Sequence, residues 1–136
     1  QRLKLTDPKA HIVLPEVISK EPLGPAVRQG DNVWGDIIAW VHYATVAAEE
    51  LGVTSKNIST LGNSTNPSVK RLLGKDGTFG ANLGIPADWA FQAVKQVGNY
   101  SEIFERNVGI NTPLGIKRGY NALWTDGGLQ YSPPIR

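Results

Sequence analysis

The chain contains no cysteine and no methionine among its 136 residues. Without cysteine it can form no disulfide, offer no thiol nucleophile and build no zinc site with thiolate ligands. The lack of methionine leads us to expect that the sequence does not begin at a translation start, so that either a leader has been removed or the sequence is part of a longer chain. These absences narrow the chemistry open to the chain before any motif is considered.

Excess charge and long apolar runs are also scarce. The formal net charge is +2, too small a basic excess for a nucleic-acid or anionic-membrane surface. The adjacent basic pairs Lys70-Arg71 and Lys117-Arg118 are typical of solvated helix ends. No segment approaches the ~20 apolar residues that a membrane-spanning helix needs. We therefore expect a protein that binds no nucleic acid and inserts no segment into a membrane.

Residues suited to catalysis or metal binding are few and poorly arranged. The two histidines, His11 and His42, fall on different predicted elements and do not form a ligand set. Glu102 and Glu105 share a helix face, but such a pair is far more often a solvated surface than a glycosidase site. The glycine-containing run 74–80 matches neither common phosphate-loop pattern. The sequence thus predicts no catalytic residue, no metal site and no cofactor, in a protein that is not an enzyme.

The beginning of the chain favours extended structure. Apolar residues over 11–19 predict an extended segment, which Pro15 restricts to an edge or connecting strand. Glu-Pro-Leu-Gly-Pro at 21–25 predicts a turn, and residues 26–28 predict a second short strand. Two lone strands leave their backbone groups unpaired, so they require a sheet that this sequence does not supply.

The remainder of the chain predicts five or six helices. The clearest covers 31–51, where Asp31 is a good N-cap, apolar residues recur at the helical period and Gly52 ends the run. Elsewhere we expect a short helix after Thr54, helices at 67–73, 86–97, 100–108 (after an Asn99–Glu102 capping box) and 112–124, a loop at 75–85, and an extended tail at 130–136.

Four tryptophans raise the question of sugar stacking. Trp34 and Trp89 lie on apolar helix faces, which favours packing in a core. Trp124 and Tyr131 flank a Gly-Gly turn and are the aromatic pair expected at the surface. One interpretation of the chain is therefore a self-contained helical interaction or scaffold module of the cell envelope, with residues 124–131 as its contact surface.

Three segments, taken in order, resemble a known family. The first is Lys-Glu-Pro-Leu-Gly-Pro-Ala-Val-Arg-Gln-Gly-Asp at 20–31, where a turn, a short strand and a helix start follow without a gap. The second is Gly-Asn-Tyr-Ser-Glu-Ile-Phe-Glu-Arg at 98–106, and the third is the tail over 106–136. Together they resemble the type II periplasmic solute-binding proteins of amino-acid ABC transporters, specifically the general L-amino-acid-binding branch. The resemblance covers nearly the whole chain.

The resemblance implies an α/β fold of the type II periplasmic-binding-protein class, with two lobes joined by two crossing strands. This chain would be a C-terminal portion of it, mostly helical with a few short strands at the start. Residues 1–10 would end the second lobe, and residues 11–25 would form a hinge crossover strand and turn. Residues 26–136 would form the C-terminal half of the first lobe, including an extended C-terminal tail.

The resemblance also implies a function, that of the amino-acid-binding subunit of an ABC importer in the periplasm of a Gram-negative bacterium. Such a subunit captures polar L-amino acids by hinge closure and works with membrane permease subunits. The arginine and aspartate with which the family holds the ligand's carboxylate and ammonium would be absent from this portion. Of the residues present, Glu21, Pro22 and Leu23 are expected beside the cleft as hinge-adjacent binding residues. Prolines 15, 22 and 25 would stiffen the connector.

Overall fold

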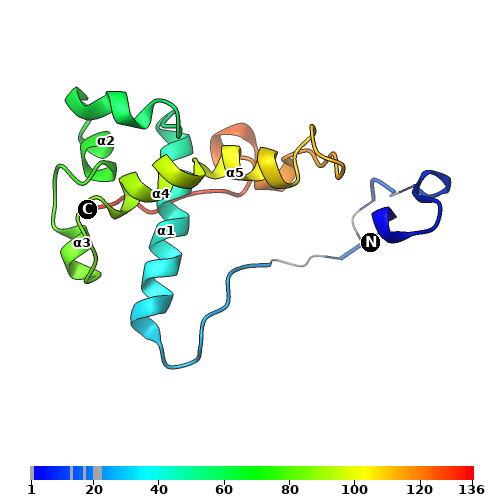
Figure 1. The fold of residues 1–136 in the computed structure, drawn as a ribbon, viewed down its shortest axis with the longest axis horizontal. Helices are drawn as coiled ribbons and strands as arrows, with labels where there is room; N and C mark the ends of the chain where they lie inside the picture. Colours follow the sequence, from blue (N-terminus) through cyan, green and yellow to red (C-terminus); the bar gives the residue numbers. More distant parts are fainter. Residues whose placement is uncertain (1, 13, 17, 20–22) are drawn as a thin grey trace.

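A computed structural model describes residues 2–12, 14–16, 18–19 and 23–136 of the chain. These residues are mostly helical, and among them the only β-type pairing is one isolated bridge between Leu123 and Gln130. Figure 1 shows a helical body, with the N-terminal segment standing apart from it. The mostly helical character predicted from the sequence is confirmed.

The short strands predicted near the start do not form in the described residues. The N-terminal segment instead contains two 3-10 turns, η1 (Arg2–Lys4) and η2 (Pro8–Ala10), the second capped by the side chain of Asp7. Residues 23–28 are extended, and the backbone of residues 23–27 forms no hydrogen bond with the other described residues. A β-strand exists only when a second strand completes its ladder, and the described chain supplies no such partner.

Helix α1 (Asn32–Glu50) is the longest element, and its predicted ends are confirmed. The Asp31 carboxylate accepts a hydrogen bond from the Trp34 backbone N–H at 3.1 Å. Only the C-terminal half of α1 is buried, because α4 and α5 run across that half (Figure 1). The N-terminal half is only partly covered, and at its start Val33 and Trp34 remain 66% and 50% exposed. The prediction that Trp34 packs in a core is therefore wrong within this chain.

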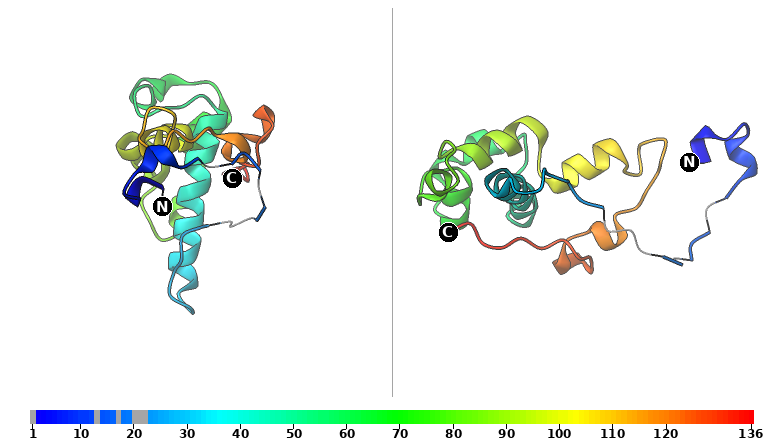
Figure 2. Two further views of the ribbon diagram at one scale, coloured as in Figure 1. Left: turned by 90° about the vertical axis from the view of Figure 1, so that its right-hand side faces the viewer. Right: turned by 90° about the horizontal axis from the view of Figure 1, so that it is seen from below.

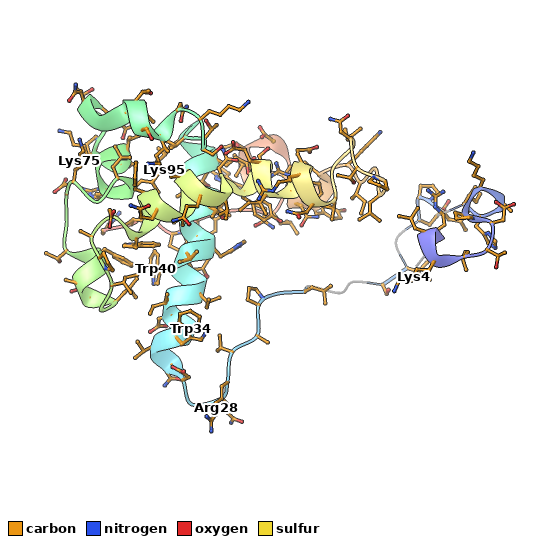
Figure 3. The ribbon with its side chains drawn as sticks, viewed as in Figure 1. Lys4, Arg28, Trp34, Trp40, Lys75 and Lys95 are labelled. Carbon is orange, nitrogen blue, oxygen red and sulfur yellow. The ribbon has the colours of Figure 1, made fainter. Side chains whose placement is uncertain are left out.

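The core lies where the end of α1 meets three further elements: η3 (Ile58–Asn63), α2 (Pro67–Leu72) and α4 (Trp89–Val97). Its fully buried large side chains are Val53, Ile58, Leu72 and Val94. Trp89 is only 8% exposed, as predicted. Trp40 points from α1 toward α3 (Phe79–Asn82), where its ring meets that of Phe79 edge-on with centroids 4.4 Å apart (Figure 3).

The 75–85 segment, predicted as a loop, contains the single-turn helix α3. Gly74 precedes this segment with a φ of +70°, a conformation that favours glycine. A Cβ at Gly74 would press on the Ala87 carbonyl group, 2.6 Å from its carbon atom. The absence of a side chain at Gly74 therefore lets the backbone before α3 pack closely against the backbone of residues 87–88 after it. Helix α4 starts at Trp89 and not at the predicted Pro86.

Helix α5 (Tyr100–Asn107) follows α4 after Gly98, whose φ is +90°. The predicted capping box is present: Asn99 Oδ1 accepts from the Glu102 N–H, and Glu102 Oε2 accepts from the Asn99 N–H, each at 2.9 Å. The helix predicted over 112–124 does not form, since only the 3-10 turns η4 (Gly119–Asn121) and η5 (Trp124–Asp126) are present there. Gly115 and Gly119 interrupt it with φ values of +60° and +49°.

Candidate functional site

The predicted hinge-adjacent residues are not gathered into a site by the described chain. Glu21 and Pro22 lie outside the described residues. Leu23 lies on the extended segment with 93% of its surface exposed. Their place beside a cleft therefore remains a prediction.

The extended segment docks on α1 shortly after Leu23. The side chain of Val27 reaches Gly35, where a Cβ would lie 3.5 Å from Val27 Cγ2. Farther along the same face, Ile38 and His42 line an apolar cavity of about 250 Å³ that the extended segment partly covers. Burial lowers the pKa of the His42 imidazole, so the ring stays neutral more readily in this surrounding. The wall offers no carboxylate or guanidinium to an amino acid.

Glu102 has a structural role, because its carboxylate accepts hydrogen bonds from three donors. Its Oε1 accepts from the Ser55 hydroxyl at 2.7 Å, and its Oε2 accepts from the backbone N–H groups of Ser55 and Asn99, both at 2.9 Å. Burial by itself would raise the pKa of Glu102, but these hydrogen bonds and the nearby Lys56 charge outweigh it and lower the pKa. A carboxylate held in its charged form by a helix cap is unsuited to act as the acid of a glycosidase pair.

An ion pair joins residues that are far apart in the sequence. Arg118 Nη2 lies 3.0 and 3.1 Å from the two carboxylate oxygens of Glu49. The guanidinium also stands 5.3 Å from the ring centroids of both Tyr100 and Phe104. Burial raises the pKa of the Tyr100 phenol, and the Arg118 charge opposes that rise.

The Arg118 side chain is 17% exposed, so the prediction of a solvated helix end is wrong for this residue. No local signal in the sequence links Arg118 with Glu49, because the pairing depends on how the tail folds back over α1. The pair fixes the C-terminal region to the helical body.

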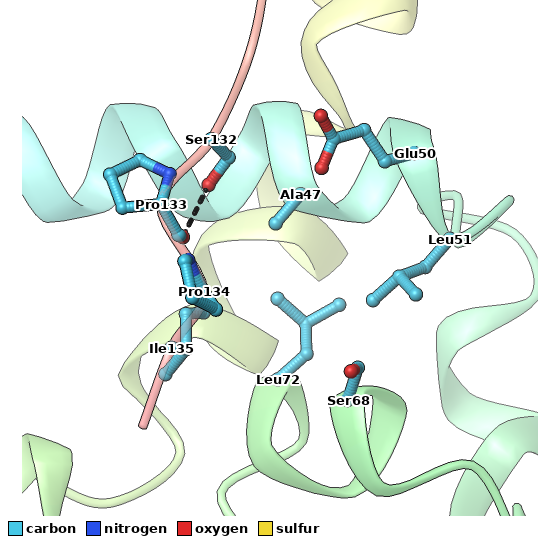
Figure 4. Close-up of a pocket in the computed structure, with 9 residues that line it drawn as sticks. All are labelled: Ala47, Glu50, Leu51, Ser68, Leu72, Ser132, Pro133, Pro134 and Ile135. Atoms are coloured by element: carbon cyan, nitrogen blue, oxygen red, sulfur yellow. Dashed lines mark hydrogen bonds between the residues drawn. The ribbon is translucent and has the colours of Figure 1, made fainter. Parts of the chain in front are cut away.

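The tail ends in a groove beside α1 and α2. A small cavity of about 160 Å³ lies there. Its lining includes Leu51 at the end of α1, Leu72 of α2 and the Ser132–Ile135 segment (Figure 4). The Ser132 hydroxyl donates to the Pro133 carbonyl at 2.9 Å. The lining has one carboxylate, that of Glu50, and no cationic group, so it lacks a partner for an amino acid's carboxylate.

Neither a metal-ligand cluster nor a helix suited to span a membrane is present in the described residues. Across residues 2–12, 14–16, 18–19 and 23–136, no three histidine or carboxylate side chains are grouped as metal ligands. Over those ranges too, none of the helices has the length and apolar character needed to span a membrane.

The predicted surface aromatics are exposed. Trp124 and Tyr131 are 60% and 63% exposed, and the neighbouring Tyr120 and Leu129 are 70% and 73% exposed. All four residues lie within or next to the segment that the Leu123–Gln130 bridge closes.

No family model matches the chain. The chain is 57% identical, over 99% of its length, to the general L-amino acid-binding periplasmic protein AapJ of Rhizobium johnstonii, of which it covers 40%. It is 54% identical over 99% of its length to the putative amino-acid ABC transporter-binding protein YhdW of Escherichia coli K12, again covering 40% of that protein. The glutamate/glutamine/aspartate/asparagine-binding protein BztA of Rhodobacter capsulatus is 54% identical over 92% of the chain, which covers 37% of it.

A solved structure is similar in fold as well. The ABC transporter periplasmic binding protein from Brucella ovis, with glutathione bound, matches 99% of the chain with a TM-score of 0.93 and 51% identity, and the chain covers 43% of it. The chain thus spans about 40% of the length of the relatives it matches. The resemblance to periplasmic amino-acid-binding proteins of ABC transporters is confirmed, as is the fold class, here represented by a mostly helical portion.

Proposed function

We propose that this chain is part of the amino-acid-binding subunit of an ABC importer, which captures polar L-amino acids in the periplasm and passes them to membrane permease subunits. The observation that carries the proposal is the 57% identity with an L-amino acid-binding periplasmic protein, maintained over 99% of the chain. Identity at this level, together with a TM-score of 0.93 against a second binding protein, supports a shared architecture and a shared task.

The extended segment of the described chain fits this role. Its backbone over residues 23–27 has no described hydrogen-bond partner, and the α1 surface beside it leaves Val33 and Trp34 exposed. A complete lobe would supply strands that pair with this backbone and side chains that cover α1. The same features weigh against a self-contained scaffold module, which would bury them itself.

Within the proposed protein, residues 1–10 would belong to the second lobe, 11–25 to the hinge, and 26–136 to the first lobe. Glu21, Pro22 and Leu23 would then lie beside the cleft between the lobes. The groups that bind the ligand's ammonium and carboxylate would come from outside this portion. The cavity beside the extended segment and the cavity at the C-terminal tail offer no such pair. Ligand would favour the closed arrangement of the lobes.

The ligands named for two of the similar proteins carry the same pair of charged groups. BztA is named for glutamate, glutamine, aspartate and asparagine, and the Brucella structure holds glutathione. Glutathione has a glutamyl end with a free α-ammonium and α-carboxylate, the same groups that every free amino acid presents. We therefore expect the intact protein to recognise these two groups first and the polar side chain second.

Calorimetry on two proteins tests the proposal. One is a full-length binding protein that carries this chain, and the other is the 136-residue chain alone. The titrants are glutamate, glutamine, aspartate, asparagine, leucine and glutathione. We expect micromolar or tighter binding of at least one polar amino acid by the full-length protein and none by the chain alone. No binding by the full-length protein would refute the function, and tight binding by the chain alone would refute our placement of the site.

A further inference from the structure

The loop that follows α5, residues 108–116, is an ordered arm. The Ile116 N–H donates to the Val108 carbonyl at 3.0 Å and closes the loop at its base. Inside it, the Thr112 N–H donates to the Gly109 carbonyl at 3.0 Å, and the Gly115 N–H donates to the Thr112 carbonyl at 3.1 Å. Local hydrogen bonds of this kind hold a loop in one conformation without burial in a core.

The base of this arm is fixed to the helical body. Gly109 packs on the last turns of α5 so closely that a Cβ there would lie 2.5 Å from Glu105 Cα. Two residues beyond the loop, Arg118 forms its ion pair with Glu49 of α1. The arm therefore projects from the body in a defined direction.

The arm presents apolar side chains toward the N-terminal segment. Leu114 and Ile116 are 47% and 45% exposed. With Pro113 they form one wall of an open cavity of about 650 Å³, whose other wall is made by Arg2, Leu3 and Ile12. Figure 1 and the right-hand view of Figure 2 both show the loop at the end of the body nearest the N-terminal segment.

We propose that the 108–116 loop is a noncovalent brace between the two lobes, whose Leu114 and Ile116 close onto Leu3 and Ile12 when the lobes close. The inference rests on the proposed function, which assigns residues 1–10 to the second lobe. Both segments lie within the 99% of the chain that matches the Brucella structure. The open cavity leaves room for closure, and apolar side chains face each other across it, with Arg2 as the one charged group of the lining.

A contact that forms only in the closed state adds its free energy to ligand binding. Removing it should weaken affinity without touching the ligand. In the full-length protein, Leu114→Ala combined with Ile116→Ala should weaken amino-acid binding about five- to tenfold by calorimetry. The matched control is Ile110→Ala, in the same loop and 62% exposed but absent from the cavity wall. An unchanged or tighter affinity in the double variant, with thermal stability preserved, overturns the brace.

Crosslinking tests the contact independently of affinity. Because the chain has no cysteine, Leu3→Cys with Leu114→Cys introduces a unique pair once any cysteine elsewhere in the protein is replaced. A short bismaleimide should join this pair faster with amino acid than without it, while Leu3→Cys with Ile110→Cys should show no acceleration. A full-length protein that binds no amino acid refutes the proposed function. Failure of the Leu3–Leu114 pair to crosslink in either state refutes the brace.

Discussion

The three hydrogen bonds that converge on Glu102 make a sharp prediction about stability. The residue links the cap of α5 to Ser55 in the segment before η3, so it ties together two parts of the fold. Oε2 accepts two backbone N–H groups and Oε1 accepts one hydroxyl. Removing the side chain leaves all three donors without this acceptor, and Asn99 is only 4% exposed to water.

Two substitutions distinguish the contribution of the Glu102 acceptor oxygens from that of its negative charge. Glu102→Ala removes every acceptor, and hydrogen bonds to a charged group contribute about 1.5–3 kcal/mol each before non-additivity and water access reduce the sum. We expect a total loss of about 3 kcal/mol. Glu102→Gln can keep its oxygen toward the two N–H groups, while the Ser55 hydroxyl rotates to accept from the new amide. We expect this variant to lose only about 1 kcal/mol.

The pH dependence has a definite sign. The pKa of Glu102 is lowered in the folded protein, so its contribution is complete above the ordinary unfolded value of 4.5 and disappears as pH falls toward the folded pKa. Glu102→Gln should lack this loss in acid. The assay is urea unfolding of the full-length protein at pH 7 and at pH 4. Equal stability of the alanine and glutamine variants at pH 7 would refute the assignment of hydrogen bonds, and an unchanged acid profile in the glutamine variant would refute the role of the charge.

Three further predictions concern the tail, a glycine and the hinge. Arg118→Ala leaves the Glu49 carboxylate without its partner and should cost roughly 2–3 kcal/mol in urea unfolding, whereas exposed Lys117→Ala should cost under about 0.5 kcal/mol. Gly74→Ala combines a positive φ with a clash on the 87–88 backbone and should cost over about 3 kcal/mol, against about 1 kcal/mol for Gly77→Ala, which has a positive φ but open space. Pro25→Ala should change the affinity or closing rate for amino acid by calorimetry and stopped flow, and no change in either would contradict hinge stiffening.

Local signals predicted the local structure well. Asp31 caps α1, Asn66 and Pro67 start α2, and Asn99 with Glu102 forms a capping box, because each of these features depends on residues within one turn of each other. The same local reasoning failed over 112–124. Apolar spacing there suggested a helix, but glycines with positive φ interrupt the segment. The ion pair between Arg118 and Glu49 also holds this segment against α1.

Long-range features could not be predicted for a physical reason. The Arg118–Glu49 pair and the Glu102–Ser55 bonds join segments that no sequence period relates, so only the folded arrangement brings them together. Trp34 was assigned to a core because its helix face is apolar. That face is apolar, but the described residues do not cover it, and Trp34 is 50% exposed.

The unpartnered surface of this chain therefore carries more information about function than its cavities do. Recognition of an amino acid requires a cation and an anion converging in a desolvated cleft. In the described residues Arg118 is already paired with Glu49. The cavity beside the extended segment is lined by mostly apolar groups and by His42, whose pKa is lowered by burial. By contrast, the extended residues 23–27 have no backbone hydrogen-bond partner among the described residues, and Val33 and Trp34 at the start of α1 are exposed apolar side chains. Exposed apolar surface next to unpaired backbone is typical of an interface with further polypeptide, and this fits the two-lobe binding protein that we propose.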